Sequence, residues 1–263
     1  LRQDVYFTDD PAFKGARRQV TAQDYVYSLK RLYDPALKSP WSFLLEGKIV
    51  GDDALKARFG YDGDIAGLRA VDKFTLRIRL NAADPNFLFY LAIPATGVVA
   101  REVVEAYGAQ VGNHPVGTGP FRIGTWKRSD QISLLANRDF RPMLFQGRRL
   151  PLVDRVDIKI MEEYQSRVLG FLNGEFDFLE QLPESMKEMV LTDDARPTLK
   201  PELARKGLVL SPFPVLQTYY MWMNMEDPLI GGYGKEKLAL RRAIALGYNS
   251  GEDVALMKKG LAL

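Results

Sequence analysis

The sequence contains no cysteine and a single histidine, His114. The absence of cysteine excludes disulfide bonds, thiolate nucleophiles and cysteine-ligated metal sites. A catalytic triad with histidine, or a metal site built on several histidines, would have to include His114 or be absent. His114 precedes Pro115, so we expect an extended loop and a structural or surface role. The cellular compartment stays open, because a chain without thiols suits reducing and oxidising spaces alike.

Long hydrophobic runs and a strong charge bias are also missing. No apolar run reaches the ~18 to 20 residues that span a bilayer. The 36 basic and 33 acidic residues leave a net charge of only +3, which produces no strong field for nucleic acid or an anionic membrane. We therefore expect no nucleic-acid partner and no direct attachment to a membrane.

The residues that are present predict a globular chain with mixed helices and strands. At 263 residues and 46% hydrophobic content, it can bury a sizeable core and form more than one lobe. Thr21 is the expected N-cap of the first helix, and Asp24 completes a capping box. Periodicity predicts helices over residues 21–33, 87–91, 164–172 and 235–246. It predicts strands over residues 1–7, 74–80, 121–126, 132–135, 156–161, 176–178, 208–213 and 217–224.

Three segments carry a family pattern. Residues 20–31 (VTAQDYVYSLKR) open a capped helix, residues 115–126 (PVGTGPFRIGTW) join a glycine-proline turn to an alternating strand, and residues 218–224 (TYYMWMN) predict an aromatic strand. In this order they resemble the peptide- and nickel-type solute-binding proteins, family 5, of bacterial ABC importers. The similarity runs through most of the chain.

This resemblance implies an α/β fold with mixed α+β content: the first lobe of a type II periplasmic binding protein with an accessory subdomain. Residues 1–98 would form the accessory subdomain, 99–216 the main α/β part, and 217–263 the crossover and the start of a second lobe. Residues 256–263 form an apolar, helix-like stretch without a cap. We expect both ends to be cuts, a second lobe that is largely missing, and weak or absent solute binding by residues 1–263 alone.

The resemblance also suggests ligand-binding residues. Trp41 follows Ser39-Pro40, where similar proteins carry an aromatic side chain, usually tyrosine, that faces the ligand. Packing of Trp41 into the accessory subdomain is the open alternative. In the aromatic strand, alternation places Tyr220 on one face, which we assign to the cleft between lobes. Trp222 and Asn224 share that face and are secondary candidates.

Other motifs have simpler explanations. Gly117 and Gly119 begin no dinucleotide loop, because the third glycine would fall at Arg122; we expect a turn, since glycine tolerates positive φ and Pro120 presets the turn. The acidic pairs are expected to be solvated surface, without catalytic spacing. These pairs are Asp9-Asp10, Asp52-Asp53, Glu162-Glu163 and Asp193-Asp194. The basic cluster Lys14, Arg17 and Arg18 is likewise expected to be a solvated loop.

The resemblance implies an extracytoplasmic, periplasmic solute-binding component of an ABC transporter. It would capture a peptide-like or other small solute between two lobes by hinge closure and deliver it to the transmembrane permease subunits. It would be no enzyme and would need no cofactor or metal. Two alternatives stay open: a hydrolase that uses loop carboxylates, and the ligand-sensing module of a transcriptional regulator.

Overall fold

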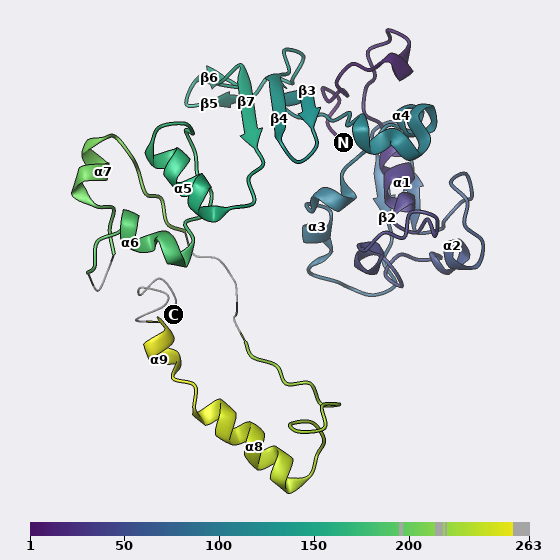
Figure 1. Ribbon diagram of the computed structural model, residues 1–263. Helices are drawn as coiled ribbons and strands as arrows, with labels where there is room; N and C mark the ends of the chain where they lie inside the picture. The colour runs from purple at the N-terminus through teal and green to yellow at the C-terminus, as the bar shows by residue number, and fades with distance from the viewer. Residues whose placement is uncertain (195–196, 214–217, 219, 255–263) are drawn as a thin grey trace. The chain divides into compact units, whose positions relative to one another are not determined.

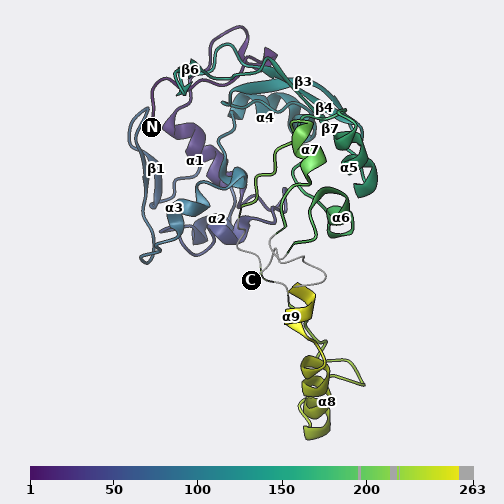
Figure 2. The ribbon, with the colours of Figure 1, turned by 90° about the vertical axis from the view of Figure 1, so that its left-hand side faces the viewer.

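The computed structural model describes residues 1–194, 197–213, 218 and 220–254 (Figures 1 and 2). The chain forms two compact units, Leu1–Ile160 and Met161–Leu263. The three segments expected from the sequence, 1–98, 99–216 and 217–263, remain predictions. The apolar stretch 256–263 lies outside the described residues.

The first unit contains all the strands of the described chain. Its α-helices are α1 (Ala22–Arg31), α2 (Asp53–Ala57), α3 (Phe87–Tyr90) and α4 (Arg101–Tyr107). Its 3-10 helices are η1 (Pro11–Phe13), η2 (Ser42–Leu44), η3 (Pro94–Thr96) and η4 (Gly108–Asn113). Its strands are β1 (Leu68–Ala70), β2 (Leu76–Ile78), β3 (Phe121–Lys127), β4 (Gln131–Ala136), β5 (Leu144–Phe145), β6 (Arg148–Arg149) and β7 (Arg155–Lys159).

Helix α1 begins at the predicted capping box. The buried carboxylate of Asp24 accepts hydrogen bonds from the backbone N–H of Thr21 at 2.7 Å and from its hydroxyl at 2.8 Å. The same carboxylate accepts two hydrogen bonds from the Arg18 guanidinium, at 2.5 and 3.1 Å. Asp24 therefore fixes the start of the helix and holds the preceding segment against it. The expectation that Arg18 is merely solvated is wrong, whereas Lys14 and Arg17 are exposed.

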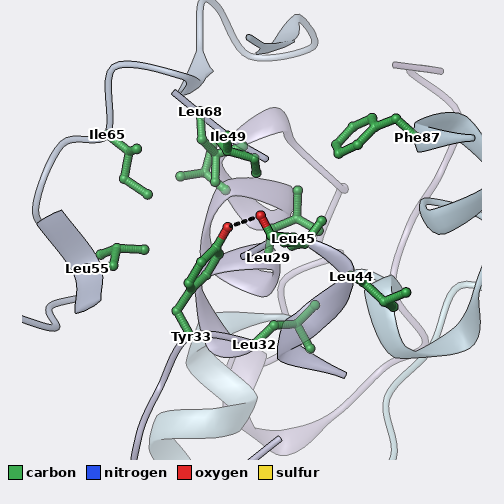
Figure 3. Close-up of a cluster of buried hydrophobic side chains, with 11 residues drawn as sticks. Leu29, Leu32, Tyr33, Leu44, Leu45, Ile49, Leu55, Ile65, Leu68 and Phe87 are labelled. Carbon is green, nitrogen blue, oxygen red and sulfur yellow. Dashed lines mark hydrogen bonds between the residues drawn. The ribbon is translucent and has the colours of Figure 1, made fainter. Parts of the chain in front are cut away.

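The largest hydrophobic cluster surrounds α1, and we call it the first core (Figure 3). The helix contributes Val26 and Leu29, and Leu32 and Tyr33 follow directly after its end, while Tyr25 is only half-buried. The remaining buried members are Leu44, Leu45, Ile49, Leu55, Ile65, Leu68 and Phe87. Burying one leucine of this kind contributes about 1.5–3 kcal/mol, so this cluster dominates the stability of its part of the unit.

The antiparallel ribbon of β1 and β2 packs on α1 (Figure 1). Strand β2 lies inside the predicted strand 74–80, and the predicted alternation is confirmed: Leu76 and Ile78 are half-buried and Arg77 is exposed. Its partner β1 was not predicted. The short helix after Asp84-Pro85 is also confirmed as α3, although its N-cap is Asn86.

A second cluster joins the N-terminal segment to α4. It comprises Phe7, Phe13, Val20, Ala100 and Val103. The strand predicted over residues 1–7 is wrong, because the structure contains only an isolated bridge between Tyr6 and Gln19. Two backbone hydrogen bonds flank it, from Phe7 to Arg18 and from Val20 to Val5, both 2.9 Å long. Residues 1–7 are thus held by backbone hydrogen bonds that are too few to form a strand.

The main sheet is antiparallel, in the order β3-β4-β7, and confirms three predicted strands. Its register shifts between Ile123 and Thr125, at Gly124. A Cβ on Gly124 would lie 2.9 Å from Cγ of Leu135, so any larger residue at the bulge would require the Leu135 side chain to shift. The small hairpin of β5 and β6 follows β4 and was not predicted.

The glycine-proline turn before β3 is held in place by hydrogen bonds to its carbonyl groups. The Gly117 carbonyl accepts a hydrogen bond from Thr8 at 2.8 Å, and the side-chain amide of Asn137 donates to the Gly119 carbonyl at 3.0 Å. The chain bends at residues 118–120, and neither glycine adopts the left-handed conformation that glycine tolerates. His114 is exposed and stacks on Tyr107 at 3.7 Å between ring centroids, in agreement with a structural or surface role.

The second unit is helical in its described part. Its helices are α5 (Tyr164–Leu172), η5 (Glu184–Met186), α6 (Lys187–Val190), α7 (Pro201–Arg205), α8 (Lys235–Leu246) and α9 (Ser250–Glu252). Helices α5 and α8 have the predicted bounds, and Gly174 follows α5 with a φ of 81°. A third cluster holds this unit and comprises Val168, Met186, Val190, Leu191 and Leu203.

The strands predicted for the second unit do not form in the described residues. Residues 176–178 and 208–213 are irregular, as are 218 and 220–224, while 214–217 and 219 lie outside the described part. A strand needs a neighbour to satisfy its N–H and C=O groups. Within the described part of this unit, only the bridge between Leu191 and Leu199 offers such a pairing.

Candidate functional site

Trp41 lies on the surface of the first unit, in the loop that follows α1. Its side chain is 43% exposed and stacks on Phe43, with 6.3 Å between the ring centroids and 30° between the planes. Phe43 is itself 63% exposed. The two residues, which we call the aromatic pair, present apolar surface to solvent on the 3-10 turn η2.

The loop of the aromatic pair is anchored in the first core. Leu44 and Leu45 follow the pair directly and are buried. The carbonyl of Leu45 accepts a hydrogen bond from the hydroxyl of Tyr33 at 3.0 Å (Figure 3). These contacts fix the backbone next to the two rings. The aromatic pair is therefore a preorganised surface, and little conformational entropy would be lost when a ligand binds to it.

The buried carboxylate of Asp52 supports the same loop. Its Oδ2 accepts a hydrogen bond from the Gly47 N–H at 2.7 Å and shares the single O–H of Tyr33, 3.1 Å away, with the Leu45 carbonyl. Burial and the negative charge of Asp52 raise the pKa of Tyr33. The phenol therefore remains protonated and keeps donating. The expectation that the pair Asp52-Asp53 is solvated surface is wrong for Asp52, which is completely buried.

The other three predicted contacts belong to the second unit. Tyr220 is 79% exposed and Trp222 is 74% exposed, and both lie in irregular backbone. Asn224 is exposed, and its side-chain oxygen accepts a hydrogen bond from the Glu226 N–H at 3.1 Å. Trp41 and these three residues thus lie in different units. The ligand-contact role of all four remains a prediction.

Phe43 is a candidate that the sequence analysis missed. The signal was present, since Trp41 and Phe43 flank a single serine, but a phenylalanine beside two leucines is usually core. Leu88 and Phe89 on α3 are a second pair of this kind, at 76% and 70% exposure. Their neighbour Phe87 is buried in the first core, so α3 is anchored by one ring and exposes two apolar side chains.

Within the described part of the chain, no group of three or more histidine, cysteine, aspartate or glutamate side chains could hold a metal ion. Across the residues that the structure describes, no helix has both the length and the apolar character to cross a membrane. The chemistry of the aromatic pair is that of a binding surface: large rigid rings without a titratable group.

The sequence matches the bacterial extracellular solute-binding proteins, family 5 (middle), over residues 1–262. The chain belongs to this family. Its mixed α/β fold is accordingly that of family 5 solute-binding proteins, as the resemblance implied.

Two curated relatives place this family 5 chain among proteins named for binding and transport. It is 26% identical over 255 residues to the probable ABC transporter periplasmic-binding protein SapA of Escherichia coli K12, covering 95% of this chain and 41% of SapA. It is 28% identical over 174 residues to the glutathione-binding protein GsiB of Salmonella paratyphi A, covering 66% of this chain and 30% of GsiB. The chain thus spans less than half the length of these relatives.

Solved family structures share the fold. OppA of Burkholderia pseudomallei matches with a TM-score of 0.59 at 21% identity, over 72% of this chain and 36% of OppA. DppA of Helicobacter pylori, in complex with the peptide STSA, matches with a TM-score of 0.57 at 21% identity, over 72% of this chain and 36% of DppA. The murein tripeptide binding protein MppA of Escherichia coli has a TM-score of 0.58 at 25% identity, over 72% of this chain and 35% of MppA.

Proposed function

We propose that this chain is part of an extracytoplasmic solute-binding component of an ABC importer, and that it captures a peptide-like or other small solute without transforming it. The observation that carries the proposal is the family match over residues 1–262. The relatives compared above are named as binding proteins for glutathione and peptides or as transport components, which supports a binding role over an enzymatic one.

In the intact protein, capture would occur between two lobes. Ligand contacts from both lobes exist together only in the closed state, so binding shifts the population toward closure. The closed protein would then deliver its solute to the transmembrane permease subunits, in the periplasm or another extracytoplasmic space. The aromatic pair supplies one side of such a contact, and Tyr220, Trp222 and Asn224 are proposed for the crossover.

Peptide-like solutes suit this surface chemically. Aromatic rings stack on peptide planes and on apolar or cationic side chains without demanding one sequence. The exchange of the tyrosine usual in similar proteins for Trp41 removes a phenol hydroxyl and enlarges the apolar face. We infer a preference for solutes with an apolar or aromatic side chain near Trp41.

The proposal is tested on the intact protein that contains this chain. The protein is purified from the periplasm under native conditions, and the solute that it carries is identified by mass spectrometry. We expect an unchanged small solute of peptide-like chemistry. Chemical turnover of the released solute by the protein would favour the hydrolase instead.

Trp41→Ala tests the contact itself. Calorimetry with the identified solute should show about a tenfold loss of affinity, equivalent to about 1.4 kcal/mol, because a stacked aromatic contact is removed. The matched control is Phe89→Ala, an exposed aromatic residue of the same unit that is not a proposed contact. Equal affinities of the wild type and Trp41→Ala would contradict the role of Trp41 and leave the family assignment intact.

A further inference from the structure

A cavity of about 460 Å³ in the first unit is lined by four arginines. We call it the basic pocket and define it by Arg17, Arg138, Arg141 and Arg149 together with the rings of Tyr6 and Phe140. Its volume falls within the ~300–1,000 Å³ of small-molecule sites. None of these residues belongs to the aromatic pair or to the proposed contacts in the second unit.

The charge of the basic pocket is not balanced by the protein. Two carboxylates, Asp4 and Asp139, line it beside the four guanidinium groups, and Asp4 is already paired with Arg2 at 2.7 Å. Among the described residues, none of the four arginines takes part in a salt bridge. The pocket therefore has an excess of positive charge that an anion would neutralise.

Two of the arginines are oriented by aromatic rings. The guanidinium of Arg17 lies 3.8 Å from the ring centroid of Tyr6, and that of Arg141 lies 4.6 Å from the centroid of Phe140. Stacking uses the flat face of a guanidinium and leaves the N–H groups at its edge available. Edge N–H groups of arginine are the donors that bind carboxylate and phosphate oxygens in pairs.

Arg141 provides an independent observation. Its Nε is buried and has no hydrogen-bond partner within the described chain. A buried donor on a charged group is costly when left unsatisfied, and such groups in native proteins usually have a partner. This Nε is closed to the cavity, whereas the terminal Nη1 and Nη2 groups of Arg141 are not buried, have no acceptor among the described residues and are left to donate to an oxyanion in the basic pocket.

The loop that carries Arg138 and Arg141 is preorganised. Asn137 is buried, donates its backbone N–H to the Pro120 carbonyl at 2.8 Å and accepts a hydrogen bond from the Asp139 N–H at 3.1 Å. Phe140 is buried and donates its N–H back to the Asn137 carbonyl at 3.2 Å. The backbone that carries the arginines on either side of Phe140 is thus held in place before any ligand arrives.

We propose that the basic pocket binds a small polyvalent oxyanion, a compound with phosphate or several carboxylate groups. Four arginines that line one cavity can donate to several oxyanion oxygens at once, and a concave site of this size fits a small molecule. A nucleic acid is less suitable, because a net charge of +3 provides no extended basic stripe along which a phosphate backbone could lie.

The test is calorimetric titration of the 263-residue chain with pyrophosphate and, separately, with citrate. We expect one-to-one saturable binding of at least one probe, and the stronger of the two identifies phosphate or carboxylate chemistry. Affinity should fall when ionic strength rises from about 20 to about 200 mM, since charge neutralisation drives binding.

Arg149→Gln removes one guanidinium from the exposed hairpin and should weaken binding about tenfold. Arg141→Lys keeps the positive charge but removes the planar guanidinium with its paired N–H donors, so it should also weaken binding. The matched control, Arg77→Gln on the exposed face of β2, should bind like the wild type. Melting temperatures of all variants show whether the fold is retained.

Four outcomes would overturn the proposal. The first three are the absence of saturable heat with both probes, unchanged affinity in Arg149→Gln, and an equal loss of affinity in the Arg77→Gln control. Binding of an oligonucleotide that depends on Arg149, without binding of either small probe, would also overturn it and would assign the surface to a polyanion.

Discussion

The most consequential single residue is Asp52, because it lies where a surface acid was expected. It sits next to Asp53, and adjacent acidic residues in loops are usually exposed. Here Tyr33 and Gly47 donate to it, and its Oδ1 has no partner within the described chain. No sequence pattern reveals such a role, since the two donors are separated from Asp52 by 19 and 5 positions.

Tyr33→Phe tests this contact. The substitution removes only the hydroxyl, so it leaves Asp52 with one donor fewer in a buried site and should lower the free energy of unfolding by about 1–3 kcal/mol. The melting temperature, measured by circular dichroism at neutral pH, should fall by about 2–4 °C per kcal/mol.

The matched control for Tyr33→Phe is Tyr25→Phe on the same helix, because Tyr25 is half-buried and its hydroxyl has no hydrogen bond to the described residues. We expect the control to melt like the wild type. Equal melting temperatures for all three proteins would show that Asp52 is satisfied by another group, such as a buried water.

At the scale of elements, the ribbon of β1 and β2 depends on a glycine that the sequence analysis did not single out. Gly67 lies between two backbone segments: its N–H donates to Val50 and its carbonyl accepts from Arg79, both at 2.8 Å. A Cβ at this position would lie 2.6 Å from the backbone N and O of Val50. Backbone atoms held in a ladder cannot move aside as a flexible side chain can.

Gly67→Ala should therefore destabilise the chain by more than about 1–3 kcal/mol, the usual cost of overpacking a core. The measurement is denaturant unfolding followed by fluorescence. Gly60→Ala is the control, because a Cβ there meets nothing within 4 Å and its φ is not left-handed. A Gly67→Ala variant as stable as the control would mean that the ribbon shifts to accept the methyl group.

Local signals predicted some elements well and others poorly. Helix α1 follows from a capping box and a periodic apolar face, and helices α5 and α8 follow from their periodic apolar faces, all of which are local in sequence. Strands β3, β4 and β7 were predicted because their apolar residues alternate with polar ones. They form because each strand has a neighbour with which it pairs. The predicted strands 176–178 and 208–213 lack a neighbour in the described chain, which local sequence cannot reveal.

The candidate site was less predictable than the fold. Trp41 was found through a family resemblance, while Phe43 required knowledge of which face of the η2 turn is exposed. The four arginines of the basic pocket come from three separate stretches of sequence. Their convergence depends on the turn at Asn137 and the pairing of β5 with β6, neither of which is visible in composition or periodicity.

At the scale of the whole molecule, several surface carboxylates link stability to pH. Hydrogen bonds from Arg101, Lys48 and Ser133 lower the pKa values of Asp62, Asp84 and Asp157, respectively. Backbone N–H groups lower the pKa values of Asp72 and Asp227 in the same way. All five carboxylates are ionised more readily in the folded chain than in the unfolded chain, where the ordinary value is 3.8.

Stability should therefore fall on acidification. A lowered pKa in the folded state means that the unfolded chain binds protons first, so the contribution is complete above the ordinary aspartate pKa and is lost as pH falls through the folded values. We expect a melting temperature that is nearly constant from about pH 7 to about pH 5 and that declines below about pH 4.

The double variant Asp72→Asn, Asp84→Asn should show a shallower decline in melting temperature, because two of the linked groups are removed. The Asp9→Asn variant serves as the control, because Asp9 is exposed and accepts no hydrogen bond from described residues. A wild-type melting temperature that stays level down to about pH 3 would contradict the linkage.

The start of α1 has a consequence for how this family can vary. One carboxylate, Asp24, receives donors from both Thr21 and Arg18, and Arg18 also reaches Glu102 on α4 at 2.7 Å. A substitution at any one of these positions leaves the remaining side chains without a hydrogen-bond partner. Single substitutions are therefore expected to be selected against, whereas compensating substitutions at two positions are tolerated. These four positions are expected to evolve as a linked unit, and the opening of this helix should be among the slowest parts of the chain to diverge.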